Sequence, residues 1–407
     1  MQRESVQSIY IKVMWLLTLG LYICIPLQIS AAQSLLYYGI FALTVGSIVM
    51  TVVSDLAQKK MDKLGFVQLV LMAVMAVCIA FSFAFSSEPF SFSLQGMGAI
   101  SFFEMLGSIY IIGSVKCEKE LKHFIYGASL VGAFIFIGFS FIPSIAYSDE
   151  ELTSLTLGFS NPNETAIYLM STICMLTLLF DVLKRWFYKV PLLLVIGYLI
   201  YLLYRTDSRT ALIATALVLL YQIFARQWVL PRWVIPVAVI FPLVFWLVYA
   251  FLWVNVESLH DVEILGKEFF SGREQYFVDK LLELRTNWPF GDVGLYYFGN
   301  MHNGPLAMIA SMGVFGFAAH VAYTVYTLYG YYPNINKKSQ TIALIVILSI
   351  FVHSSAEATF IVGGAHYSII VATFYLLLKD DEEDGIEFRL EDETSDVLLP
   401  EVQTSSR

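Results

Sequence analysis

The sequence is poor in charge and in cysteine. Only 14% of its 407 residues are charged, against about a quarter in soluble proteins, whereas 58% are hydrophobic. This scarcity of charge, together with long apolar runs, excludes a soluble enzyme, a nucleic-acid-binding protein and a disordered chain. The 4 cysteines are too few and too scattered for a disulfide framework. The first apolar run lacks a small-residue cleavage site, so we expect a retained membrane span rather than a removed signal peptide.

The negative net charge belongs to the C-terminal end of the chain. Residues 380–407 contain 11 acidic and 2 basic side chains, whereas residues 1–379 contain 22 of each. We therefore expect two parts: a polytopic transmembrane domain over residues 1–379 and an acidic, disordered cytoplasmic tail over residues 380–407. The charge of the tail carries no information about the partners of the membrane domain.

Apolar runs near the length that crosses a bilayer recur along the chain. A helix needs about 20 residues to span the hydrocarbon, and helices satisfy their own backbone groups in lipid. We therefore predict an all-α polytopic membrane protein with about twelve transmembrane helices. The runs are Val13–Ile29, Leu35–Val53, Leu64–Phe85, Leu94–Val115, Phe124–Ile142, Ala166–Phe180, Val190–Tyr204, Thr210–Phe224, Val234–Val254, Leu306–Tyr329, Ile342–Phe360 and Ile361–Leu378.

The connections between these runs predict the orientation. With the N-terminus inside, 16 basic residues of the membrane domain fall on the inner side and 6 on the outer side. Basic connections mark the cytoplasmic face, so we expect both termini in the cytoplasm and a location in the bacterial cytoplasmic membrane. Two outer connections are long, Tyr147–Asn163 and Asn255–His302.

Two arginines stand where the apolar runs leave little room for charge. The segment Tyr204–Thr210 contains Arg205, Asp207 and Arg209 and joins two runs of only 15 residues. Such a run spans about 22 Å, less than the roughly 30 Å hydrocarbon, so both guanidiniums should be drawn into the outer leaflet. A guanidinium suits phosphate oxygens. Snorkelling or an internal pair with Asp207 is the alternative, but two arginines share one aspartate, which favours phosphate binding.

The long outer loop Asn255–His302 contains a further arginine. Ser271 and Glu274 have the spacing of a capping box, and apolar residues at helical spacing follow them. We therefore predict an amphipathic helix in this loop and assign Ser271 and Glu274 a structural role. Arg273 falls in its first turn, where a cation opposes the helix dipole. A bound anion would offset that penalty, and an ordinary exposed arginine is the alternative.

Further polar residues stand at or within the apolar runs. His302 and Asn303 precede the run Leu306–Tyr329, and an imidazole can accept a proton at neutral pH. His353 and Glu357 lie four apart and are expected on one face of a single helix, and Glu104 is expected midway along another. These residues form either a polar seam for substrate or contacts between helices and termini.

Taken together, these features resemble the O-antigen ligase and polymerase family. The resemblance rests on the number of spans and on the order and sidedness of short motifs, which cover about 160 residues. The motifs are Gly158–Asn163, Ser208-Arg209, Ser271-Gly272-Arg273-Glu274, His302-Asn303-x-x-Leu306 and Met312–Gly316. The acidic tail is outside the family pattern.

The resemblance implies a GT-C-like fold and a glycosyl transfer at the outer membrane face. The donor would be a glycan on undecaprenyl pyrophosphate, with no metal or other cofactor, and one-step displacement would invert the anomeric centre. Arg209 and Arg273 match the family's pyrophosphate-binding arginines, and His302 matches its catalytic histidine. The remaining candidates for substrate contacts are Arg205, Asn163, Asn303, His353 and Glu357.

Polymerisation of lipid-linked repeat units is the favoured activity, and ligation of the glycan to another acceptor is the alternative. The expected partners are the donor, the acceptor glycan and the bilayer, with a flippase and a chain-length regulator, but no nucleic acid. The alternative from another class is a flippase or transporter for lipid-linked oligosaccharides, in which buried Glu104, His353 and Glu357 would form the path. The position of the arginines at the outer face argues for chemistry there.

Overall fold

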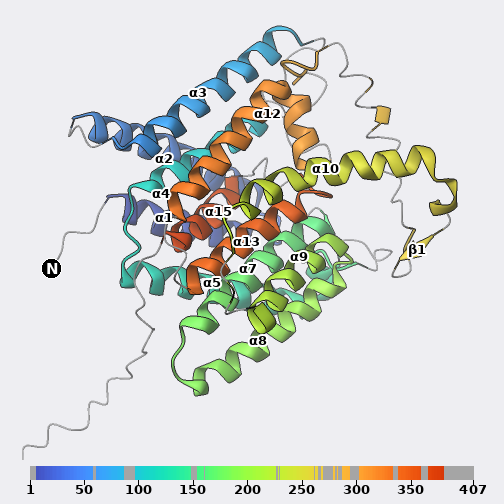
Figure 1. Cartoon of the computed structure of the whole chain (residues 1–407). Helices are drawn as coiled ribbons and strands as arrows, with labels where there is room; N and C mark the ends of the chain where they lie inside the picture. The colour runs from blue at the N-terminus through green and yellow to red at the C-terminus, as the bar shows by residue number, and fades with distance from the viewer. Residues whose placement is uncertain are drawn as a thin grey trace, which may run out of the picture.

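The computed structural model contains one helical bundle (Figure 1). It describes residues 6–57, 61–86, 97–147, 154–159, 161–225, 228, 230–260, 262–264, 267–268, 278–279, 282, 287–293, 302–332, 338–358 and 365–379. The long helices are α1 (Val6–Cys24), α2 (Ser30–Ala57), α3 (Lys63–Ala84), α4 (Met97–Gly113), α5 (Lys119–Ser140), α7 (Pro162–Val182), α8 (Trp186–Arg205), α9 (Arg209–Leu220), α10 (Val234–Asn255), α12 (Gly304–Tyr331), α13 (Lys338–His353) and α15 (Ala365–Leu378).

Short elements join some of these helices. A single turn, α6 (Pro143–Ala146), follows α5, a π-turn, η2 (Tyr221–Ala225), extends α9, and a 3₁₀ turn, η3 (Glu257–Leu259), follows α10. Beyond η3, the two-residue strands β1 (Glu263–Ile264) and β2 (Lys267–Glu268) pair antiparallel, with Glu263 opposite Glu268. This ladder of two residues on each side lies in the predicted long outer loop, and the fold is otherwise helical, as predicted.

Eight helices are long and apolar enough to cross a membrane. They are α1, α2, α3, α5, α7, α8, α10 and α12. The shorter apolar helices α4, α9, α13 and α15 coincide with four further predicted runs. The prediction of a polytopic helical membrane protein is therefore confirmed at this level, and the count of twelve spans stays a prediction.

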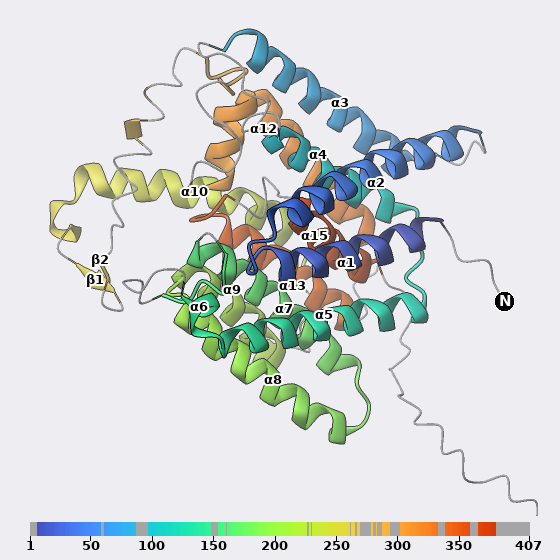
Figure 2. The same cartoon turned by 180° about the vertical axis from the view of Figure 1, so that it is seen from behind.

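The most buried of the eight long helices lies at the centre of the bundle. Within α7, 83% of an 18-residue apolar window is buried, against 17% for α2 at the periphery. Figures 1 and 2 show α7, α13 and α15 in the interior, with α3 along one edge and α8 along the opposite edge. The peripheral helices present large apolar side chains outward, such as Leu35 and Leu194, each 72% exposed. An apolar surface of this extent requires a surrounding as apolar as lipid.

Polar side chains tie the buried helices to one another. Gln68 of α3 donates to Thr327 of α12 at 3.0 Å, and the Tyr323 hydroxyl of α12 donates to the Leu106 carbonyl of α4 at 2.8 Å. Between apolar helices there is little hydrophobic driving force in lipid, so interhelical hydrogen bonds and close packing hold the arrangement.

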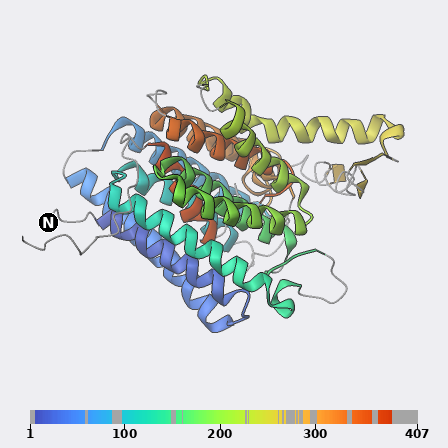
Figure 3. The same ribbon diagram turned by 90° about the horizontal axis from the view of Figure 1, so that it is seen from below.

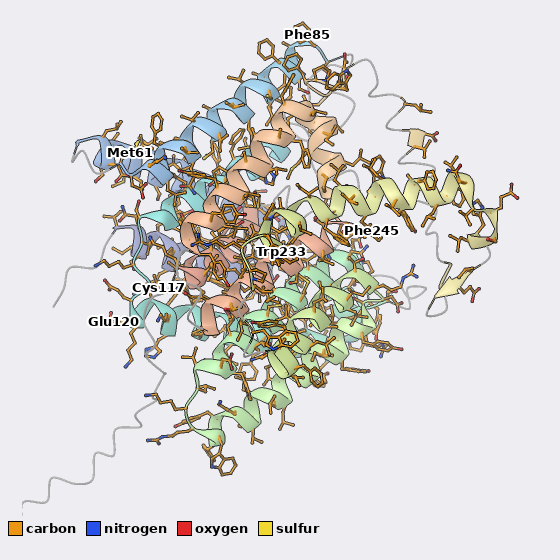
Figure 4. The ribbon with its side chains drawn as sticks, in the orientation of Figure 1. Met61, Phe85, Cys117, Glu120, Trp233 and Phe245 are labelled. Carbon is orange, nitrogen blue, oxygen red and sulfur yellow. The ribbon has the colours of Figure 1, made fainter. Side chains whose placement is uncertain are left out.

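Two of the predicted inner connections lie at the same end of the bundle. Met61, Cys117 and Glu120 lie on one side of the view, and Phe85 lies at the far end of α3 (Figure 4). We call the end with Phe85 the distal end. Figure 3 shows that the last part of α10 extends beyond the other helices there.

The expectation that both helices around Arg205 and Arg209 are too short for the bilayer is wrong for α8. This helix begins at Trp186 and has 20 residues, which corresponds to about 30 Å. The predicted run began at Val190 and so left out the first turn of this helix. The helix α9 together with η2 runs over Arg209–Ala225. The argument for phosphate binding therefore cannot rest on helix length and has to come from the local geometry.

Two predictions fall outside the described residues. The first is the acidic tail from Asp380 onward. The second is most of the predicted amphipathic helix of the outer loop, including Ser271, Arg273 and Glu274.

Candidate functional site

A buried carboxylate at the distal end joins two of the predicted site residues. The Oε1 atom of Glu357 accepts a hydrogen bond from Asn163 Nδ2 at 2.8 Å, and its Oε2 atom lies 3.2 Å from His302 Nδ1. The three residues come from parts of the chain as far as 194 positions apart. The structure thus brings together Asn163, His302 and Glu357, and we call them the distal triad.

The exposure of the triad differs from one side chain to the next. The Glu357 side chain is 8% exposed, whereas the His302 side chain is 43% exposed. An ionised Glu357 accepts from the Nδ1–H of His302, and the tautomer that donates there has its lone pair on Nε2. The buried Glu357 thus orients His302 through Nδ1, and the rest of the imidazole ring is partly exposed to a ligand.

The position of Glu357 corrects one prediction. We expected His353 and Glu357 on one face of a single helix, but α13 ends at His353. The Ser354 carbonyl accepts from the Gly304 N–H at 2.9 Å, and the Ser354 hydroxyl donates to the Phe351 carbonyl at 2.6 Å. The start of α12 thus binds the chain just after α13 and turns it out of the helix. As a result Glu357 faces Asn163 and His302.

The side chain of Asn303 connects the start of α12 to α10 and to the segment after α13. It is fully buried, and its Oδ1 accepts from the Leu306 N–H at 2.9 Å, which caps the start of α12. Its Nδ2 donates to the Ser355 carbonyl at 3.0 Å and reaches the Pro242 carbonyl of α10 at 3.4 Å. We therefore assign Asn303 a role in positioning His302 and Glu357 in place of the expected contact with substrate.

His353 and Glu104 lie in the protein interior. His353 is fully buried at the end of α13, and Glu104 of α4 is 3% exposed. In this conformation both side chains are closed off from a ligand at the distal surface. Neither contributes to the distal triad, and we leave both out of the site.

Arg205 is held by two tyrosines at the distal end of α8. Its Nη1 donates to the Tyr201 hydroxyl at 3.0 Å, and its Nη2 donates to the Tyr147 hydroxyl at 2.6 Å. The guanidinium carbon also lies 5.8 Å from the Tyr147 ring centroid and 5.9 Å from that of Tyr201, within the range of cation–π attraction. These bonds hold the guanidinium in place while it stays partly exposed.

Sequence reasoning missed both tyrosines. Tyr201 lies four residues before Arg205 on the same helix, a spacing at which side chains meet, so the sequence contained that signal. Tyr147 is 58 positions away from Arg205, and its contact comes from the tertiary fold.

Arg209 begins α9, immediately after a tight turn. Asp207 adopts a left-handed backbone conformation with φ of 57°, and its carboxylate accepts from the Ser154 hydroxyl at 2.8 Å. Ser208 forms no side-chain capping bond within the described part of the chain. The first turn of α9 therefore combines the positive end of a helix dipole with a guanidinium, and both favour an anion.

The segment 154–159 contacts both the turn between Arg205 and Arg209 and the start of α7. The Leu155 N–H donates to the Arg205 carbonyl at 2.8 Å, and the Thr165 hydroxyl, near Asn163 on α7, donates to the Thr156 carbonyl. In addition, α9 packs against both α7 and α13. The two arginines and the distal triad therefore belong to neighbouring elements at the same end of the bundle.

Arg273, the remaining predicted arginine, lies outside the described residues. Within the described ranges, no cluster of three or more His, Cys, Asp or Glu side chains could hold a metal ion. No protein-family model, curated protein or solved structure significantly matches the chain. The resemblance to the O-antigen family therefore rests on the sequence motifs alone.

Proposed function

We propose that this protein is a membrane glycosyltransferase that polymerises glycan repeat units linked to undecaprenyl pyrophosphate. The reaction would take place at the distal end, facing away from the cytoplasm. The observation that supports it most is the carboxylate of Glu357, which binds Asn163 and His302 and holds the imidazole with Nε2 available. The choice of a glycan as substrate comes from the sequence motifs.

In the proposed reaction His302 is the general base. Its Nε2 takes the proton from an acceptor hydroxyl as that oxygen attacks the anomeric carbon and the bond to the lipid pyrophosphate breaks. Glu357 stabilises the imidazolium that forms, and Asn163 fixes the carboxylate from its other side. A positioned general base contributes about 10²–10⁴ in rate.

The leaving pyrophosphate gains negative charge as its bond to the sugar breaks. Arg209, Arg205 and the first turn of α9 would stabilise that charge, because they present fixed positive groups at the same end of the bundle. Removing one such donor typically costs about 10²–10³ in rate. Arg273 joins this group on the strength of its sequence motif alone.

Transfer of the glycan to another anchor, as in a ligase, would use the same groups. A flippase is the candidate from another class. It would move lipid-linked glycans without bond formation, and the buried Glu104 and His353 would then line its path.

The test is chain growth in vesicles that contain the purified protein and lipid-linked repeat units on the distal side. We expect longer chains from the parent protein and loss of at least about 100-fold in the initial rate for Arg209→Ala and His302→Ala. Arg185→Ala, at the opposite end of α8, and His260→Ala, whose ring stacks on Trp253 at 4.0 Å, are matched controls.

Three results would contradict the proposal. Transfer to an added acceptor without chain growth would indicate a ligase, and exchange of lipid sidedness without bond formation would indicate a flippase. Normal chain growth by Arg209→Ala and His302→Ala would exclude the site itself.

A further inference from the structure

Helix α12 is broken at Gly313, nine residues after its start. Gly313 has φ of 71° and ψ of 179°, and the helices on its two sides meet at a bend (Figure 1). In an unbroken helix the N–H of Val314 would donate to the carbonyl of Ala310. The break separates these two groups, and unpaired backbone groups are costly at membrane depth.

A segment of the long outer loop satisfies both groups. The Val314 N–H donates to the Trp288 carbonyl at 3.0 Å, and the Ala310 carbonyl accepts from the Asp292 N–H at 2.7 Å. Residues 287–293, which we call the splint, thus replace the missing bond within the helix by two bonds, and the Phe315 N–H adds a third to the Pro289 carbonyl at 3.4 Å. Figures 1 and 2 show the splint between the end of α3 and the bend of α12.

Two glycines allow the splint and the helix to come this close. A Cβ atom on Gly313 would lie 2.1 Å from the Pro289 carbonyl oxygen, and one on Gly291 would lie 2.5 Å from the Ala310 carbonyl oxygen. Gly291 also has a positive φ, of 76°. Because the obstructing atoms belong to the backbone, no side-chain movement could make room for a larger residue.

The splint is fastened to α3 as well. The Val293 N–H donates to the Ser82 hydroxyl at 2.8 Å, and the Ser86 hydroxyl donates to the Asp292 carboxylate at 2.8 Å. Asp292 is 2% exposed and Val293 is fully buried. The Phe290 ring adds a contact with Phe81 of α3, with centroids 5.2 Å apart.

We propose that the splint holds α12 in its bent form and thereby sets the position of His302, which lies just before the first residue of α12. Gly291, Gly313, Ser82 and Ser86 are positioning residues in this arrangement. The inference rests on the proposed function only for its effect on the reaction. The bend and its fastening are a separate, measurable property of the chain.

The test weakens the bonds to α3 and leaves α12 and the distal triad unchanged. In a full-length background without native cysteines, Val293→Cys reports whether the splint is docked, because a buried thiol does not react with maleimide. We expect Ser82→Ala with Ser86→Ala to raise the labelling rate about tenfold, from the loss of two hydrogen bonds. The control is Gly197→Ala, at a glycine with nothing near its Cβ position, which should leave the rate unchanged.

A covalent tether then distinguishes positioning from a general loss of folding. Trp288 and Phe315 are 52% and 54% exposed, with ring centroids 6.4 Å apart, so cysteines at these positions can be joined by a short bis-maleimide. We expect Ser82→Ala with Ser86→Ala to lower the rate of chain growth at an unchanged KM for the donor, and the tether to restore it.

An unchanged labelling rate, or a raised labelling rate with full activity, would overturn the inference. If the parent protein transfers no glycan, the proposed function fails, and labelling of a His302→Cys thiol then reports the start of α12. If the Ser82 and Ser86 substitutions leave the labelling rate of the His302→Cys thiol unchanged, the inference is overturned by itself. A change in this labelling rate that the tether reverses would support it.

Discussion

The hydrogen-bond pattern around Glu357 allows a sharp test of the distal triad. Asn163 donates to this carboxylate through Nδ2 at 2.8 Å, and His302 Nδ1, 3.2 Å from the other oxygen, donates to it when Glu357 is ionised. A carboxylate accepts from both, whereas a glutamine of the same shape has one accepting oxygen and one donating NH₂ group. In Glu357→Gln the new NH₂ group therefore faces a donor, either Asn163 Nδ2 or His302 Nδ1. The alternative is that His302 adopts the tautomer that accepts through Nδ1 and has no lone pair on Nε2.

The size of the effect follows from the charge of the acceptor. A hydrogen bond to a charged group contributes about 1.5–3 kcal/mol, and each 1.4 kcal/mol corresponds to about a factor of ten. We therefore expect Glu357→Gln to lower the rate of chain growth about 10- to 150-fold. Asn163→Asp should also lower it, because it places a second carboxylate against the first.

The double variant Asn163→Asp with Glu357→Gln should recover activity. In this variant the NH₂ group of the introduced amide donates to the introduced carboxylate, and the oxygen of the same amide accepts from His302. The net charge of the site is also restored. We expect the double variant to be at least about tenfold faster than the product of the two single effects predicts.

The assay is the initial rate of chain growth in vesicles with matched amounts of inserted protein. Gln222→Glu, at an amide that donates to the Thr177 carbonyl away from the distal end, controls for a simple change of charge. A double variant that is no faster than expected from independent effects would refute the assigned pattern of donors and acceptors.

Two further predictions concern Arg205 and Asn303. Tyr147→Phe removes the hydroxyl that accepts from Arg205 at 2.6 Å, so we expect the KM for the lipid-linked donor to rise about 3- to 10-fold. The control Tyr204→Phe, at an exposed tyrosine, should leave this KM unchanged. Equal effects of the two substitutions would contradict the role of Tyr147 in holding Arg205. Asn303→Ala removes the cap of α12 and the bond to the Ser355 carbonyl, so we expect about 1–3 kcal/mol less stability. Thermal unfolding in detergent measures this, with Asn255→Ala, at an exposed asparagine bonded within its own helix, as the control; an unchanged melting temperature for Asn303→Ala would contradict the role.

The sequence alone predicted the helices well, because transfer into lipid depends on the composition of each segment by itself. The run Phe124–Ile142 corresponds to α5, and Leu306–Tyr329 corresponds to α12, with ends that differ by only a few residues. The error at α8 arose because the predicted apolar run began at Val190, just after Lys189, whereas the helix begins at Trp186. A lysine can lie inside a membrane helix near its end, where its charged group reaches the surface, so an apolar run can be shorter than the helix that contains it.

The candidate site could be predicted in part. The sequence identified Asn163, His302 and Glu357 one by one, but it placed Glu357 on the wrong element. Only the tertiary structure decided that α13 stops at His353, because the N–H group that binds the Ser354 carbonyl comes from Gly304, 50 positions earlier in the chain.

The same distinction applies to the break in α12. Apolar composition determined that this segment would be a helix, and it could not indicate a bend at Gly313. That bend depends on carbonyl and N–H partners supplied by residues 287–293. Local chemistry thus determined which segments are helical, whereas contacts between distant segments decided where the helices end and which side chains meet.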